Sequence, residues 1–212
     1  VRHRFQVDKV VFIPTGRPAH KTDKEVTHNE HRYLMAVLAT MRNENFEVSR
    51  LEIDRPGITY TIDTIEQLKK MCRPDVRLYF ITGADAIHQI MTWKEPERLL
   101  SLCDFVAVTR PGYQKNQMFE EIGELREKFA SRIHYMEVPA LAISSSDIRT
   151  RAQKGMPIQY LLPQEVEDYI HKFGLYRNQR KNEVKFMLPI EVMQEKLQSA
   201  LSVKPYIHTM GV

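Results

Sequence analysis

Five short apolar runs alternate with amphipathic segments through the first 176 residues, and this alternation limits the folds open to the chain most strongly. An apolar run is typical of a strand buried on both faces, whereas apolar residues at helical spacing indicate a helix packed on a sheet. The predicted strands cover residues 7–14, 46–53, 76–81, 103–109 and 133–138. The alternation therefore predicts an α/β fold with a doubly wound parallel sheet.

The composition excludes several classes of function. The chain has 212 residues and a formal net charge of +4, which is too small to argue for nucleic-acid binding but allows a phosphorylated ligand. No apolar run approaches the roughly 18 residues that a membrane span requires. Cys72 and Cys103 lack the spacing of a zinc site, so a reducing, cytoplasmic compartment is the simplest expectation.

Three consecutive serines follow the last predicted strand. In the stretch ISSSDIR, the hydroxyls of Ser144, Ser145 and Ser146 coincide with the free N–H groups of a helix amino end. Such an end attracts anions, and Arg149 adds a permanent charge with several donors. The same residues also fit an ordinary cap made by Ser144 and Asp147, with Arg149 as a solvated surface residue.

Two other loops follow predicted strands, where open α/β sheets bind ligands. His20 and Lys21 lie in the first loop, and their spacing fits a phosphate contact and a solvated loop equally well. The second contains the motif TYTIDT, which opens a helix beside the ring of Tyr60. Thr61 is the expected N-cap of that helix.

Gly83, Asp85 and Trp93 follow the third predicted strand. Gly83 allows a ligand to approach the backbone, and Asp85 can accept two sugar hydroxyls. Trp93 is the only tryptophan, and its polar loop leaves the ring able to stack on a flat ligand. A lone tryptophan, however, more often fills the core or the surface.

His28 and His31 have a spacing seen at metal sites, but no third ligand accompanies them. We interpret them as exposed histidines in the first turn of a helix capped by Thr27. No metal is assigned there.

Taken together, four motifs closely resemble the bacterial nicotinate-nucleotide adenylyltransferases, a nucleotidyltransferase family with a Rossmann-like fold. The motifs are PTGRPAHK ending at Lys21, TYTIDT ending at Thr64, GAD ending at Asp85 with Trp93 after it, and ISSSDIR ending at Arg149. The resemblance runs in order from residue 1 to about residue 176. It implies transfer of AMP from ATP to nicotinate mononucleotide, giving deamido-NAD and pyrophosphate, with Mg²⁺ accompanying ATP.

The resemblance also implies which residues bind the pyridine substrate. Trp93 would stack on the nicotinate ring, and the turn at Tyr60 and Thr61 would meet its carboxylate. His20 and Lys21 would contact the same substrate.

The implied ATP site lies on the other two motifs. Asp85 would hold ribose hydroxyls beside Gly83. The residues implied to contact the ATP phosphates are Ser144, Ser145, Ser146 and Arg149, of which Ser145 and Arg149 would take part in catalysis. The family usually has threonine where this chain has Ser146, a change that keeps the hydroxyl.

Both ends of the chain raise further expectations. The family opens with a strand and a His-x-Gly-His motif, whereas this sequence begins at Val1 inside the following helix. We expect residues 1–176 to form a domain that lacks its first strand and is inactive alone. Residues 177–188 are predicted to be a linker. Residues 189–212 resemble the helical start of bacterial HD-domain phosphohydrolases, a fused second domain in which His208 would be the first metal ligand.

Two alternatives remain open. A related adenylyltransferase could use another acceptor such as phosphopantetheine, although Trp93 and the TYT turn argue against it. A non-catalytic nucleotide-binding fragment is the second alternative. The sequence leaves open whether the chain forms a homo-oligomer and whether it prefers nicotinate or nicotinamide nucleotides.

Overall fold

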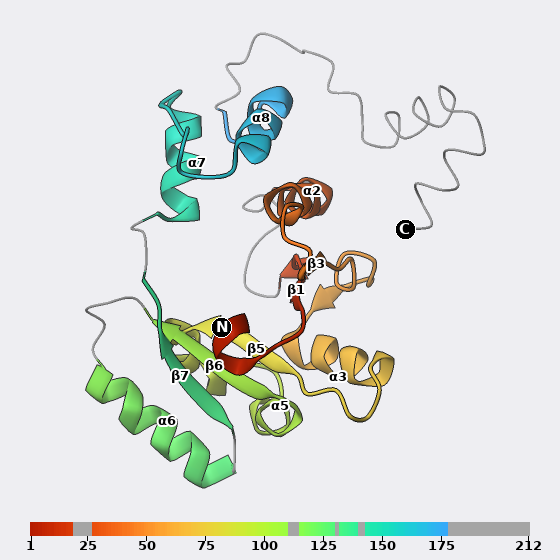
Figure 1. Ribbon diagram of the computed structural model, residues 1–212, viewed down its shortest axis with the longest axis vertical. Coiled ribbons are helices and arrows are strands. Elements are labelled where there is room, and N and C mark those ends of the chain that lie inside the picture. Colours follow the sequence, from red (N-terminus) through yellow and green to blue (C-terminus); the bar gives the residue numbers. More distant parts are fainter. Residues whose placement is uncertain (19–26, 110–114, 130–131, 140–142, 178–212) are drawn as a thin grey trace, which may run out of the picture.

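The computed structural model describes residues 1–18, 27–109, 115–129, 132–139 and 143–177. Strands and helices alternate through them (Figure 1). The strands are β1 (Val10–Phe12), β2 (Arg17–Pro18), β3 (Phe46–Val48), β4 (Ile58–Thr59), β5 (Tyr79–Gly83), β6 (Asp104–Thr109) and β7 (Ile133–Glu137). The helices are α1 (Arg2–Phe5), α2 (Asn29–Thr40), α3 (Thr61–Met71), α4 (Ala84–His88), the 3₁₀ helix η1 (Ile90–Thr92), α5 (Pro96–Leu102), α6 (Lys115–Phe129), α7 (Ser145–Gln153) and α8 (Gln164–Phe173).

All strand pairs are parallel, which confirms the α/β class. The strands form three separate sheets rather than the single sheet that the sequence predicts: β1–β3, β2–β4 and β5–β6–β7. The register of the largest sheet places Phe80 beside Phe105 and Phe105 beside Ile133. The strand predicted over residues 46–53 ends at Val48, because residues 51–55 form turns and bends. The strand predicted over residues 76–81 instead occupies Tyr79–Gly83.

The larger hydrophobic core lies against β5–β7. Phe105, Val106 and Ala107 of β6 are all fully buried. Since successive side chains of a strand point to opposite faces, this burial shows that both faces of β6 are covered. Leu99 of α5 and Ile122 of α6 belong to the same core as Phe105. The apolar run thus forms the central strand of the lower part of the molecule in Figure 1.

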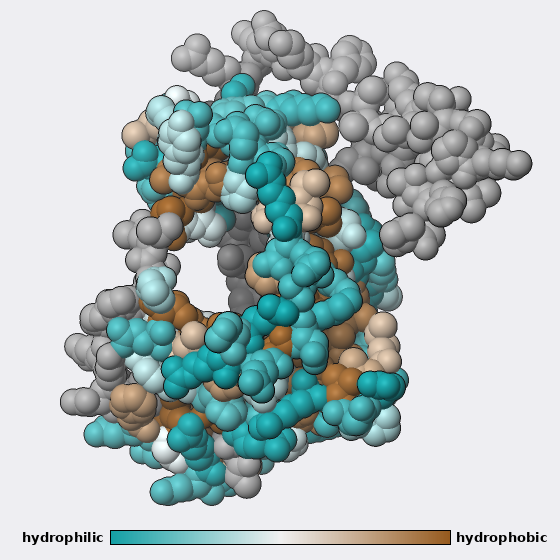
Figure 2. Space-filling model, viewed as in Figure 1, coloured by the Kyte–Doolittle hydropathy of each residue, from teal (hydrophilic) through white to brown (hydrophobic). Residues whose placement is uncertain are grey.

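A second, smaller core joins α2, α7 and α8 in the upper part of Figure 1. It contains Ala152 of α7 with Val166 and Ile170 of α8, and Met35 and Leu38 of α2 pack against them. Figure 2 shows an opening between these helices and the sheet of β5–β7, with apolar residues on its margin.

No helix in the described part of the chain is long and apolar enough to cross a membrane. The predicted linker beyond residue 177 and the predicted second domain at 189–212, with His208, lie outside the described residues.

Candidate active site

The serine cluster opens α7, and one of its serines acts as the cap. The Oγ of Ser144 accepts a hydrogen bond from the N–H of Asp147 at 3.1 Å. Ser145 and Ser146 are exposed, and Arg149 donates from Nη2 to the Oγ of Ser146 at 3.1 Å. The capping interpretation is therefore confirmed for Ser144, and it leaves two hydroxyls and a guanidinium together near the amino end of α7.

Gly83 and Asp85 lie where β5 passes into α4. Gly83 ends the strand and is the N-cap of α4, and Asp85 is exposed in the first turn of that helix. A Cβ built on Gly83 would meet no atom within 4 Å, so open space lies beside this backbone. These residues are at the carboxyl end of a parallel strand, as predicted from the sequence.

The TYTIDT motif separates into inward and outward residues. Thr59 is buried and donates to the carbonyl of Arg17 at 3.1 Å, which ties β4 to β2. Ile62 is 1% exposed in the larger core. Thr64 is buried and donates to Oε1 of Glu52 at 2.7 Å. These three inward residues position the turn, so the half-exposed Tyr60 and Thr61 are the ones available to a ligand.

The expected cap at the start of α3 is wrong by one residue. Tyr60 is the N-cap, Thr61 is the first helical residue, and no side chain caps the helix. A helix start normally leaves four N–H groups without intrahelical partners. The amino end of α3 therefore offers more open donors than an N-cap at Thr61 would have left.

Trp93 follows η1 and is half-buried. Its ring meets that of Phe80 edge to face, with the centroids 6.0 Å apart, and it packs against the larger core. Trp93 thus fills part of the core as well as bordering solvent. The edge-to-face contact fixes the orientation of the indole ring.

Sequence reasoning missed the side chain that joins this turn to α3. Lys94 donates from Nζ to both carboxylate oxygens of Asp63, at 3.0 Å and 3.2 Å. The same Nζ lies 4.7 Å from the centroid of the Tyr60 ring. The adjacency of Lys94 to Trp93 was the only signal in the sequence, because spacing alone does not reveal a partner 31 residues away.

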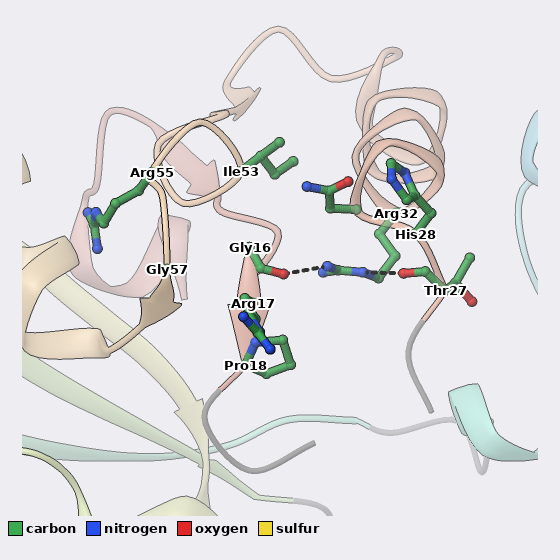
Figure 3. Close-up of a pocket in the computed structure, with 10 residues that line it drawn as sticks. Gly16, Arg17, Pro18, Thr27, His28, Arg32, Ile53, Arg55 and Gly57 are labelled. Atoms are coloured by element: carbon green, nitrogen blue, oxygen red, sulfur yellow. Dashed lines mark hydrogen bonds between the residues drawn. The ribbon is translucent and has the colours of Figure 1, made fainter. Parts of the chain in front are cut away.

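A cavity of about 290 Å³ lies beside the loop predicted to contact the substrate (Figure 3). Its walls come from the residues on both sides of segment 19–26, from the start of α2 and from the turn before β4. The residues lining it are Gly16, Arg17, Pro18, Thr27, His28, Asn29, Arg32, Ile53, Arg55 and Gly57. Three arginines favour an anionic occupant, but His20 and Lys21 themselves lie outside the described residues.

Two contacts shape this cavity. Arg32 donates to the carbonyl oxygens of Thr27 and Gly16, each at 2.9 Å, and burial lowers the pKa of its guanidinium (Figure 3). A Cβ on Gly16 would lie 2.0 Å from the carbonyl oxygen of Glu52, so only glycine allows this approach. Arg32 therefore holds the two ends of the loop in place.

The two histidines of α2 differ from the prediction. His28, rather than Thr27, is the N-cap, and its Nδ1 accepts from the N–H of Glu30. His31 is 7% exposed and contacts Tyr169 of α8 instead of facing solvent. The described residues contain no group of three His, Cys, Asp or Glu side chains that could hold a metal ion.

The structure thus places the predicted residues in separate groups. Ser145, Ser146 and Arg149 lie together at the start of α7, whereas Tyr60 and Trp93 border the same core near the start of α3. In the part of the chain that the structure describes, no hydrogen bond, ion pair or ring contact joins these two groups. A ligand in contact with both would have to extend between them.

The chain is similar to proteins of a known family. The family described as Cytidylyltransferase-like matches residues 1–151. A Thermoanaerobacter protein named "Probable nicotinate-nucleotide adenylyltransferase" is 52% identical over 184 residues, covering 87% of this chain and 87% of that protein. A Moorella thermoacetica protein of the same name is 54% identical over 176 residues, covering 83% of this chain and 81% of that protein.

Solved structures share the fold. Plasmodium falciparum nicotinic acid mononucleotide adenylyltransferase complexed with APC superposes with a TM-score of 0.62 at 22% identity, covering 80% of this chain and 83% of that chain. The same enzyme complexed with NaAD gives a TM-score of 0.63 at 23% identity with the same coverage.

Proposed function

The chain belongs to the nicotinate-nucleotide adenylyltransferase family of cytidylyltransferase-like proteins, and from this premise we propose that it transfers AMP from ATP to nicotinate mononucleotide. In this reaction a phosphate oxygen of the mononucleotide attacks the α-phosphorus of ATP. The bond from that phosphorus to the bridging oxygen breaks, and pyrophosphate leaves with the electron pair. The products are deamido-NAD and pyrophosphate.

The proposal rests mainly on the grouping of two serine hydroxyls and an arginine near the amino end of α7. Because Ser144 satisfies the cap, Ser145 and Ser146 can donate their hydroxyl hydrogens to phosphate oxygens. Arg149 lies beside Ser146 and supplies a permanent positive charge. Charge that develops on the leaving pyrophosphate would be stabilised there by donors already in place. No covalent intermediate with the protein is needed, since the two nucleotides react directly with each other.

Further residues would orient the two substrates. Asp85 offers carboxylate oxygens to ribose hydroxyls, and Gly83 leaves space for the nucleotide. The indole of Trp93 would stack on the pyridine ring, while the open N–H groups at Tyr60 and Thr61 would donate hydrogen bonds to the carboxylate of that ring. Holding both substrates in this way removes much of the entropic barrier to their reaction.

Mg²⁺ enters the proposal as the counterion of ATP. Mg²⁺ commonly binds through substrate phosphates with few protein ligands, so the ATP phosphates would hold most of the ion. When bound, it would reduce the charge of the triphosphate. A reducing, cytoplasmic location fits the free thiols of Cys72 and Cys103.

Two finer parts of the fold also remain proposals. Val11 and Phe12 of β1 and Ile81 of β5 are 43%, 37% and 39% exposed, and β1 does not pair with β5. Among the described strands, β1 pairs only with β3 and β5 only with β6, so each has an edge at which an additional strand could join the separate sheets. An HD-type second domain from residue 189, after a linker at 177–188, rests on the sequence resemblance alone.

The function is tested with the purified protein. ATP, Mg²⁺ and nicotinate mononucleotide should yield deamido-NAD and pyrophosphate in equal amounts. Product formed only with phosphopantetheine would assign the chain to a different adenylyltransferase. Nucleotide binding without any product would show a non-catalytic binding protein.

A further inference from the structure

Lys94 links two segments of the candidate pyridine site. Its Nζ hydrogen-bonds both carboxylate oxygens of Asp63 and lies over the ring of Tyr60. Asp63 and Tyr60 belong to the amino end of α3, whereas Lys94 lies in the turn between η1 and α5, next to Trp93. The ammonium group of Lys94 therefore connects two parts of the site. It contacts the start of α3, which is expected to bind the ring carboxylate, and its own residue follows Trp93, which is expected to stack on the ring.

The place of Asp63 in α3 gives this ion pair a specific consequence. Tyr60 is the N-cap, so Asp63 is the third helical residue, where an acidic side chain often turns back to cap the helix. No side chain caps α3. Both oxygens of Asp63 are instead bonded to Lys94, so the N–H groups at the helix start stay open to a ligand.

Neutralisation of the Asp63 charge by Lys94 also favours binding of a carboxylate at the start of α3. An unneutralised Asp63 would lie within one helical turn of the place where a substrate carboxylate is expected, and like charges at such distances repel. A neutral amide on the ring would not experience this repulsion. Whether the charge of Asp63 is neutralised therefore affects the relative affinity of the site for a pyridine nucleotide with a ring carboxylate and one with a ring amide.

We propose that Lys94, by neutralising and restraining Asp63, determines the preference of this site for a pyridine nucleotide with a ring carboxylate over one with a ring amide. The inference rests on the proposed function. Lys94 acts through Asp63 and is thus a specificity-determining rather than a catalytic residue.

A contribution to folding alone does not account for this arrangement. The side chains of Lys94 and Asp63 are 40% and 36% exposed, and ion pairs with such exposure add little to stability. A merely structural role would also weaken binding of the acid and the amide equally. The ratio of the two affinities is therefore the decisive quantity.

The single tryptophan provides a binding signal that does not depend on turnover. Quenching of Trp93 fluorescence by nicotinate mononucleotide and by nicotinamide mononucleotide gives a Kd for each in the wild type and in Lys94→Met. The variant should bind the acid on the order of tenfold more weakly and the amide within about twofold of the wild type. Lys9→Met is the control, because Lys9 forms a surface ion pair with Glu47 away from this site.

A second variant tests the mechanism. Asp63→Asn in the Lys94→Met background removes the charge that Lys94 neutralised, so it should restore most of the preference for the acid. Equal weakening of both ligands in Lys94→Met, or no recovery in the double variant, would overturn the proposal. Quenching of the wild type by neither nucleotide would instead count against the proposed function.

Discussion

His31 Nδ1 lies 2.8 Å from the hydroxyl of Tyr169, and this contact joins α2 to α8 across the smaller core. The imidazole also packs against Phe173, with the ring centroids 5.4 Å apart. Because α8 and α7 share that core, the contact helps to hold the helix that carries the serine cluster. Protonation of His31 is therefore expected to affect the stability of the core that supports α7 and its serines.

We predict that stability falls as the pH drops below about 6.5. Burial lowers the pKa of His31 from its ordinary value of 6.5, and the charge of His28 acts in the same direction while Glu30 opposes it. Below pH 6.5 the unfolded chain then binds more protons than the folded chain, which costs the fold at most about 1.4 kcal/mol per pH unit. Urea unfolding between pH 5 and 8 measures this slope.

Two variants test whether His31 causes this pH dependence of stability. His31→Gln should flatten the pH dependence, whereas His28→Gln, which changes an exposed histidine on the same helix, should keep most of it. A flattened profile in His28→Gln alone would contradict the assignment.

Arg149→Lys should lower kcat on the order of tenfold although the charge is kept, because an ammonium cannot reproduce a two-pronged contact with phosphate oxygens. Arg151→Lys is the control, since Arg151 is on the same helix and pairs with Asp147 at 2.8 Å. Steady-state kinetics with varied ATP measure the effect. A raised KM for ATP with unchanged kcat would show that Arg149 binds the ground state and the transition state equally.

Trp93→Ala should weaken binding of the pyridine nucleotide more than binding of ATP. Stacking of a base on an aromatic ring contributes about 1–3 kcal/mol, which corresponds to roughly 5- to 150-fold in affinity. Trp93→Phe keeps a ring beside Phe80 and should retain most of the affinity. Isothermal titration with each nucleotide compares the losses, and equal losses would refute the stacking role.

Cys103 should be unreactive in the native protein. Burial raises the pKa of its thiol to about 12, and the nearby charge of Asp104 acts in the same direction. Since the thiolate is the reactive form, a disulfide reagent at pH 8 should modify Cys72 quickly and Cys103 only after unfolding. A count of released chromophore per chain checks this. Two thiols reacting at the same rate in the native state would contradict the burial of Cys103.

Local patterns along the sequence determined much of the fold. The apolar runs at Val10 and Phe105 predict strands that the structure contains, and the hydroxyl of Ser144 caps the expected helix. These features depend on neighbouring residues, so one stretch of sequence is enough to predict them. The positions of Ser145, Ser146 and Arg149 near the amino end of α7 follow for the same reason.

Tertiary structure alone decided which distant residues meet. Lys94 and Asp63 are 31 residues apart in the sequence, and His31 and Tyr169 are 138 residues apart. Each of these four side chains has an ordinary local pattern, so the sequence indicated an exposed His31 and no role for Lys94. Which helix packs on which, and with what register, depends on how residues far apart in the sequence fill the two cores seen among the described residues. For that reason the ion pair at the start of α3 and the buried histidine could be recognised only in the folded molecule.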